Sequence, residues 1–448
     1  MLRGLVYRLL FGGAAMTHLS PDFVRDRLLS SIDSLLDLRS EFLVNPETDF
    51  TRTKKISFEQ AMLFPMVAGA DNLDTELIGF FNEDMIPSAS SMIQRRNQIK
   101  SSAFEQLFLT FTSLIPILRT FRGYRLIACD GSRLNLPYNP SDPDTFLQCI
   151  KDRKGINQIH LNCLYDILND FFIDTELQPI KQMDEKNAFC RLLENQLSHQ
   201  LVIYIADRGY AVYNIFAHAI HNDQLFLIRV PEAFAKGICT GKDHWLEGDA
   251  ADIEVTVTVG RSRAKKNRQL ENYHCIDSKG HYDFIEPGST DVDVLKLRVL
   301  KFPVGENNYE YIVTNIPQYR LSRKEIKEIY RLRWGIETAF RHLKYAGNMV
   351  HLHSVKREFL LQEIYAKLTM YNFSAFLAMC VDKRGKRSSR KYSYEINHTR
   401  LQKISIRFLA GKIKDVLVLL IKALVPVRPG RSFQRNLRRQ SADTLAYR

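Results

Sequence analysis

The chain has 448 residues, more than one ordinary hydrophobic core holds, so two to four domains are expected. Its apolar fraction of 45% is typical of folded proteins and excludes an intrinsically disordered chain. The net charge of +13 favours a polyanionic partner, with nucleic acid ahead of an anionic membrane surface.

The seven cysteines are scattered, without a CxxC pair or the Cys/His spacing of a zinc site, which indicates a reducing compartment and no structural metal. Arg8 interrupts the apolar N-terminus, so we expect a short helix, or translation starting at Met16, rather than a signal peptide. The longest apolar segment, 364–381, contains Lys367 and Asn372 and is expected to be a buried helix rather than a membrane span.

Residues 20 to about 120 have helical periodicity. Residues 91–108 follow a short polar turn and are expected to form the second helix of a helix-turn-helix-like arrangement. Its polar side chains suited to DNA are Gln94, Arg95, Arg96 and Lys100. Basic residues are also common on helices that do not bind DNA, so both interpretations stay open at this element.

After residue 120 the pattern changes to strand periodicity. Strands are predicted at 124–130, 160–168, 171–177, 201–206 and 224–230, with helices at 184–196 and 211–220. Asn169-Asp170 indicates a hairpin between the second and third strands. This order predicts a mixed sheet with helices packed on its faces.

Residues 231–318 are β-rich, with strands predicted at 254–259, 295–302 and 309–314. A helix containing Glu337, a buried helix at 357–381 and a tail with an apolar helix at 415–425 follow. Basic runs at 261–268, 383–391 and 428–439 suit a polyanion, although such runs are also found on ordinary solvated surfaces.

Residues 330–344, with the sequence YRLRWGIETAFRHLK, gather polar side chains on one helix edge. On a regular helix of about 100° per residue, Tyr330, Arg333, Glu337 and Lys344 share a stripe about 60° wide. A core-facing apolar stripe lies beside it, made by Ile329, Leu332, Ile336, Ala339, Phe340 and Leu343. Taken alone, this pattern is more often a solvated charged edge than a functional site.

Three acids stand out by position. Asp130 ends the first strand, Asp207 follows the strand at 201–206, and Glu337 lies on the helix just described. Each alone is more often a turn residue or a surface charge. Together they can converge and hold two hard divalent cations, which activate a nucleophile and stabilise the leaving oxygen of a phosphodiester. Arg333 and Lys344 suit phosphate oxygens.

Tyr330, Arg333, Glu337 and Lys344 match the Y-x2-R-x3-E-x6-K signature of bacterial DDE transposases of the insertion-sequence-four family. Asp130 in CDGS and Asp207 in DRGY, together with Glu337, resemble the catalytic triad of that family in order and local context. The resemblance extends over roughly residues 50–440.

The resemblance implies an α/β fold: an RNase H-like mixed-sheet catalytic core with a β-rich insertion domain and helical N- and C-terminal regions. The corresponding division is a helical DNA-binding region at 1–120, the first part of the core at 121–232, the insertion at 233–319, the second part of the core with the Glu337 helix at 320–382, and a basic helical tail at 383–448.

It also implies a cut-and-paste DNA transposase. The three carboxylates bind two Mg²⁺ ions, for which Mn²⁺ can substitute; water cleaves the strand at the end of the element, and the freed 3′-hydroxyl attacks the opposite strand, giving a hairpin, or the target DNA. By the same resemblance Tyr330, Arg333, Lys344 and Arg208 grip DNA near the cleaved end. Trp245 is a candidate for stacking on a flipped base, with core packing as an equal alternative.

The expected partners are terminal inverted repeats and target DNA, bound by a homodimer in the bacterial cytoplasm at the nucleoid, with no membrane association. Two rivals stay open: an RNase H-like structure-specific nuclease without strand transfer, and a catalytically silent DNA-binding derivative. The four-residue signature and the C-terminal extension count against the first, and the intact acids count against the second.

Overall fold

The computed structural model describes residues 19–52, 55–148, 154–196, 201–240, 248–277, 280–306, 308–381 and 394–427. The chain forms two compact units, each assembled from stretches that are not contiguous in sequence. The first comprises Met1–Pro116, Leu134–Ile159 and Phe340–Arg448, and the second comprises Ile117–Arg133 and His160–Ala339. The five-part division expected from the sequence stays a prediction.

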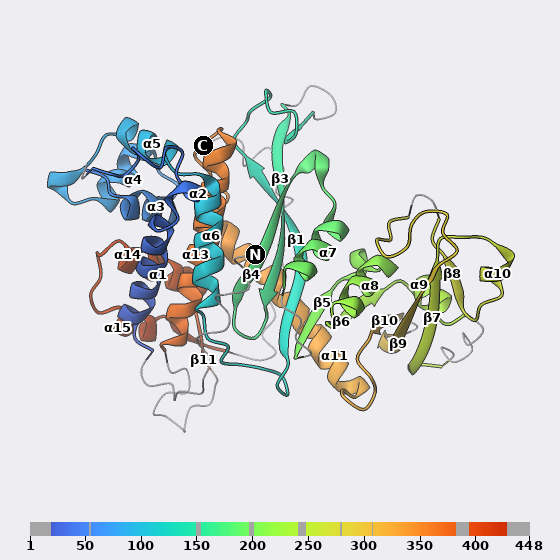
Figure 1. The fold of residues 1–448 in the computed structure, drawn as a ribbon. Helices are drawn as coiled ribbons and strands as arrows, with labels where there is room; N and C mark the ends of the chain where they lie inside the picture. The colour runs from blue at the N-terminus through green and yellow to red at the C-terminus, as the bar shows by residue number, and fades with distance from the viewer. Residues whose placement is uncertain are drawn as a thin grey trace. The chain divides into compact units, whose positions relative to one another are not determined.

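The first unit is mainly helical in its described residues (Figure 1). Its elements are α1 (Pro21–Leu36), α2 (Arg39–Phe42), α3 (Phe58–Val67), α4 (Leu73–Phe80), η3 (Glu83–Met85), α5 (Ala89–Asn97), α6 (Ser101–Ser113), β2 (Phe146–Leu147), the π-helical turn η8 (His342–Ala346), α13 (Arg357–Met379), β11 (Tyr394–Ile396), α14 (His398–Leu409), α15 (Val416–Lys422) and β12 (Leu424–Pro426).

Helix α13 is the centre of this unit. It is buried on nearly all sides and packs against α1, α3, α6 and α14. A helix that is apolar all round must be enclosed by other elements, so the buried helix expected in this region is confirmed. Within the described stretches, no helix has the length and apolar character needed to cross a membrane.

The second unit is built on a mixed sheet (Figure 1). Its strands are β1 (Arg125–Leu136), β3 (Ile156–Asp166), β4 (Phe171–Pro179), β5 (Val202–Ala206), β6 (Leu225–Val230), β7 (Ala251–Gly260), β8 (Tyr273–Cys275), β9 (Val292–Gly305) and β10 (Asn308–Thr314). Its helices are η4 (Ile180–Gln182), α7 (Glu185–Asn195), η5 (Arg208–Tyr210), α8 (Tyr213–His221), α9 (Glu232–Ile238), α10 (Lys265–Arg268), α11 (Arg323–Arg331), η7 (Leu332–Trp334) and α12 (Gly335–Arg341).

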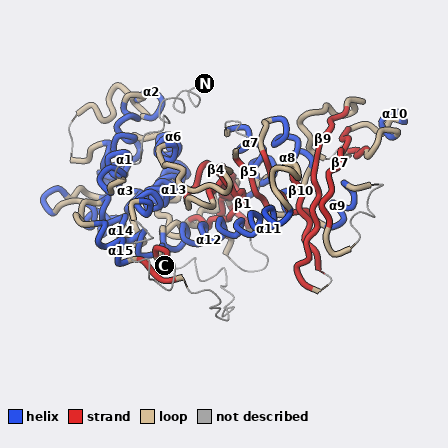
Figure 2. Tube along the Cα trace, turned by 90° about the horizontal axis from the view of Figure 1, so that it is seen from below, coloured by secondary structure: helices blue, strands red, loops and turns tan. Residues whose placement is uncertain are grey.

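Within the second unit the strand order is β3-β1-β5-β6-β10-β9-β7-β8, and β4 pairs with β3. Strands β1, β5 and β6 run parallel, and β3 and β4 are paired neighbours joined by a short turn. The predicted fold class, an RNase H-like mixed α/β core, is confirmed by this arrangement. The strands of the β-rich segment extend the same sheet, because β10 pairs with β6, and β9 and β7 continue beside it (Figure 2).

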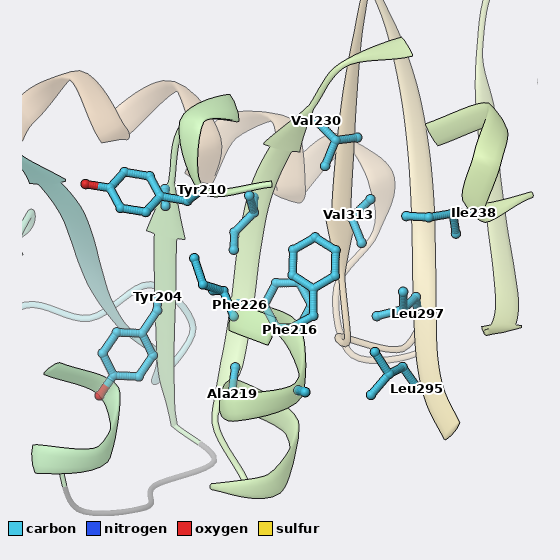
Figure 3. Close-up of a cluster of buried hydrophobic side chains, with 14 of the residues drawn as sticks. Tyr204, Tyr210, Phe216, Ala219, Phe226, Val230, Ile238, Leu295, Leu297 and Val313 are labelled. Atoms are coloured by element: carbon cyan, nitrogen blue, oxygen red, sulfur yellow. The ribbon is translucent and has the colours of Figure 1, made fainter. Parts of the chain in front are cut away.

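Side chains of this sheet alternate between two apolar clusters. Along β5, Ile203 and Ile205 join the cluster that includes α11, whereas Tyr204 joins the cluster that includes α7 and α8. In the second cluster Phe216 of α8 stacks on Phe226 of β6 with ring centroids 5.0 Å apart (Figure 3). Both faces of the central strands are therefore covered, as parallel strands require.

Two expected element boundaries are wrong. Strand β1 does not end at Asp130 but continues to Leu136, because β3 lies alongside it as a hydrogen-bonding partner. Residues 330–344 do not form one regular helix: the 3₁₀ turn η7 separates α11 from α12, and the π-helical turn η8 follows. Each change of hydrogen-bond spacing rotates the later side chains, so a single helical wheel does not place Lys344.

Of the two interpretations left open for the helix-turn-helix-like element, DNA contact by Arg95 and Arg96 does not agree with the structure. Both are buried: Arg95 donates to a backbone carbonyl, and Arg96 forms an ion pair of 3.2 Å with Glu363 of α13. Lys100 donates to backbone carbonyls as well, and Gln94 is exposed. The two arginines therefore hold the helical unit together, because their partners are buried with them.

Candidate active site

Asp130 lies in the interior of β1, beside β5. Its carboxylate accepts a 2.9 Å hydrogen bond from the N–H of Gly131. The pKa of Asp130 is raised from 3.8 to about 6, chiefly by burial and then by the charges of Asp207 and Glu337, while Gly131 and Arg333 act in the opposite direction. The three acids are therefore close enough to act on one another electrostatically.

Asp207 directly follows β5 and precedes the turn η5. Ala128 of β1 pairs with Ile205 of β5, so Asp130 and Asp207, each two residues further on, come abreast on adjacent parallel strands. The Asp207 carboxylate accepts a 2.7 Å hydrogen bond from the N–H of Gly209. A Cβ on residue 209 would lie 3.0 Å from the same carboxylate oxygen, so glycine lets the Asp207 carboxylate come close to the backbone at this position.

Glu337 lies on α12, and its carboxylate accepts a hydrogen bond from Arg333, four residues earlier in the chain. The two side chains meet at 3.0 Å; the side chain of Arg333 is 9% exposed and that of Glu337 is 38% exposed. Burial by itself lowers the pKa of Arg333, but Tyr330, Glu337 and Asp130 together raise it above its usual value. Arg333 is thus a permanent cation inside an acidic cluster.

Two donors in this cluster lack a partner in the described part of the chain. They are the Tyr330 hydroxyl and the Nε of Arg333, both buried. Burial is the main cause that raises the pKa of Tyr330 to about 12, so the phenol keeps its proton. Because buried polar atoms are nearly always satisfied in native proteins, these two donors fit a ligand with oxygen acceptors, such as a phosphate.

The three acids have the donor chemistry that divalent cations require. Asp130, Asp207 and Glu337 offer carboxylate oxygens, the ligands that Mg²⁺ prefers, and their mutual repulsion is what a cation relieves. Among the described residues, no three His, Cys, Asp or Glu side chains already surround one point closely enough to hold an ion. The donor chemistry fits, and the carboxylates must draw together when a cation binds.

The sequence model of the family described as Transposase DDE domain matches residues 121–373, more than half of the chain. The chain belongs to this family. The stretch matched to the DDE transposase domain contains the three acids together with Tyr330 and Arg333. A comparison with curated proteins finds no match.

Among solved structures, this DDE transposase domain protein is similar to the piggyBac transposase synaptic complex with hairpin DNA. The TM-score is 0.44 at 9% sequence identity, and the alignment covers 91% of this chain and 82% of that chain. The likeness is distant.

The structure gathers five of the eight residues singled out in the sequence, namely Asp130, Asp207, Tyr330, Arg333 and Glu337. Arg208 is exposed on η5, next to Asp207 in the chain. Lys344 belongs to the other compact unit, where burial lowers its pKa. Trp245 lies outside the described residues.

Three further residues near the acids were not singled out in the sequence. Trp334 follows Arg333 directly, is 62% exposed, and its ring centroid lies 5.4 Å from the Arg333 guanidinium carbon. On a helical wheel of residues 330–344 Trp334 falls outside the apolar stripe, and this position in the sequence already indicated an exposed side chain. His160 of β3 and Glu185 of α7 meet beside Gly131, and no sequence pattern links them.

Proposed function

We propose that this DDE-family chain is a DNA transposase of the insertion-sequence-four type. It binds the terminal inverted repeats of its element as a homodimer, cleaves the DNA strand at their ends and joins the freed 3′-hydroxyl to target DNA, with hairpin ends as the intermediate. The observation that carries this proposal is the convergence of Asp130, Asp207 and Glu337 in one partly buried cluster that also contains Arg333.

Asp130, Asp207 and Glu337 would hold two Mg²⁺ or Mn²⁺ ions, which would supply activation of water and stabilisation of the leaving oxygen in phosphodiester cleavage. Arg333 neutralises charge on the phosphate while it holds Glu337 in place. Its Nε and the Tyr330 hydroxyl donate to phosphate oxygens. Trp334 and Arg208 present an aromatic face and a second cation to DNA at the edge of the cluster.

The proposed setting is the bacterial cytoplasm, where chromosomal DNA is accessible. The positive charge of the chain favours association with DNA at long range. The exposed part of the 261–268 run, Arg263, Lys265, Lys266 and Arg268, lies after β7 and is available for backbone phosphates.

The test is a cleavage and joining assay on end-labelled duplexes taken from the DNA on either side of the coding sequence. Purified full-length protein is incubated with Mg²⁺ or Mn²⁺, and with EDTA as the metal-free reaction. Glu337→Gln removes one catalytic charge, and Glu328→Gln, an exposed acid on α11, is the matched control.

Metal-dependent nicking at the repeat boundary followed by joining, lost in Glu337→Gln and retained in Glu328→Gln, is the expected result. A hairpin product would establish the route. Cleavage without joining would favour the nuclease, and specific binding without cleavage in either metal would favour the silent DNA-binding derivative.

A further inference from the structure

His160 is an unusual histidine for the interior of a sheet. It lies on β3, is 2% exposed, and neither ring nitrogen makes a well-directed hydrogen bond within the described residues. Its Nε2 stands 2.9 Å from a carboxylate oxygen of Glu185, in ion-pair contact. A buried side chain whose nitrogens lack well-directed hydrogen bonds requires an explanation, and this acid is the polar group recorded beside it.

The contact between His160 and Glu185 sits directly against Gly131. A Cβ on residue 131 would lie 2.2 Å from Nε2 of His160 and 3.0 Å from Oε1 of Glu185, so no other residue fits there without displacing the pair. Gly131 is also the residue whose N–H is bonded to the Asp130 carboxylate. Gly131 therefore contacts both the His160–Glu185 pair and the carboxylate of Asp130.

Glu185 is accessible from outside although its partner is buried. It is the first residue of α7, and its side chain is 40% exposed. Burial raises the pKa of Tyr210, and the charges of Asp130, Glu185 and Asp207 all raise it further, which places Glu185 in the same electrostatic neighbourhood as the two catalytic aspartates.

We propose that Glu185, held beside Gly131 by His160, is a fourth carboxylate of the active site and helps to bind the divalent cation next to Asp130. This inference rests on the proposed metal-dependent function. Arg333 offsets one of the three charges of Asp130, Asp207 and Glu337, so the cluster alone balances two divalent cations poorly. A further carboxylate at its edge improves that balance.

Apart from its contact with His160, Glu185 is not needed to attach α7 to the sheet. The helix is already capped by Asp184, and Arg191 forms a two-pronged ion pair with Glu176 of β4. Phe189 and Leu193 bury its apolar face. The attachment of α7 to the sheet therefore does not need the charge of Glu185.

The test measures Mn²⁺ binding to the full-length protein without DNA, by electron paramagnetic resonance of the free ion. Wild type is compared with Asp130→Asn, Glu185→Gln and Glu185→Asp. Glu176→Gln is the matched control, because it removes an acid that holds the same helix but lies in the Arg191 pair. Thermal unfolding without metal shows that each variant is folded.

We expect Glu185→Gln to weaken Mn²⁺ binding by about tenfold or more, Glu185→Asp to recover part of it, and Glu176→Gln to bind as wild type does. Wild-type affinity in Glu185→Gln, with binding still lost in Asp130→Asn, would overturn this inference and leave the proposed function standing. Absence of Mn²⁺ binding by the wild type, or unaltered binding in Asp130→Asn, would overturn the metal-dependent function itself.

Discussion

Arg333 donates a 3.0 Å hydrogen bond to the Oε1 of Glu337 while its own Nε remains without a partner in the described residues. The Arg333 guanidinium thus has two roles: it orients the Glu337 carboxylate, and its buried Nε can donate to a ligand. Arginine suits both because its donors form a rigid, planar fork, whereas lysine offers a single point charge.

Replacing Arg333 with lysine preserves the charge and removes the fork. We expect the single-turnover rate of DNA cleavage to fall by about 100-fold, which is about 3 kcal/mol of transition-state stabilisation. Arg331→Lys, an exposed position at the end of α11, should leave the rate unchanged. Equal rates for both variants would show that the geometry of Arg333 is not used in the reaction.

Trp334 is predicted to stack on a DNA base. The chain has two tryptophans, so fluorescence can be assigned with single variants. Quenching on DNA binding should persist in Trp245→Phe and disappear in Trp334→Phe, and Trp334→Ala should weaken DNA binding by about 1–3 kcal/mol. Quenching that disappears only in Trp245→Phe would instead assign the stacking role to Trp245.

Asp130 should destabilise the metal-free protein at neutral pH. Its pKa is about 6 in the folded chain and 3.8 ordinarily, so folding favours the protonated form and the free energy of unfolding falls as pH rises through this interval. In EDTA, Asp130→Asn should raise the free energy of unfolding by about 2 kcal/mol at pH 8, after allowance for partial exposure.

The stabilisation by Asp130→Asn should shrink as pH falls from about 6 and vanish below about pH 3, where the aspartate is protonated in both states. Urea unfolding at a series of pH values measures it. A difference between the two proteins that does not change with pH would mean that the substitution acts through packing and not through charge.

Arg96 should matter for stability and not for DNA affinity. Its removal takes one cation from the buried carboxylate of Glu363, which His353 also contacts at 3.8 Å, and breaking a buried ion pair costs about 3–5 kcal/mol. Gln94→Ala, on the exposed side of the same helix, should cost less than about 0.5 kcal/mol. Thermal unfolding and DNA titrations on folded protein separate the two effects; a normally stable Arg96→Ala that no longer binds DNA would restore the helix-turn-helix interpretation.

Local patterns were sufficient to predict the parts of the structure that depend on neighbouring residues. The apolar run at 201–206 became β5, and Asp207 was recognisable as the polar residue that ends it. Arg333 and Glu337 are four residues apart, so their pairing follows from helical geometry even though the helix is not regular throughout.

Contacts between distant segments could not be predicted in this way. Arg96 is buried because Glu363, more than 260 residues later, is buried with it, and a basic residue on an amphipathic helix otherwise suggests a surface. His160 and Glu185 meet only when β3 and α7 are assembled. β1 continues past Asp130 because β3 lies beside it, whereas the strand predicted from the sequence ended at Asp130.

The pairing of β10 with β6 also limits how this protein can be shortened. β6 has the sequence LFLIRV, and without residues 233–319 its outer backbone N–H and C=O groups would form an open, apolar edge. Such an edge is a template for pairing with other chains, so a truncated protein should aggregate rather than survive as a minimal nuclease. Residues 233–319 therefore protect the edge of the core sheet in addition to any role of their own.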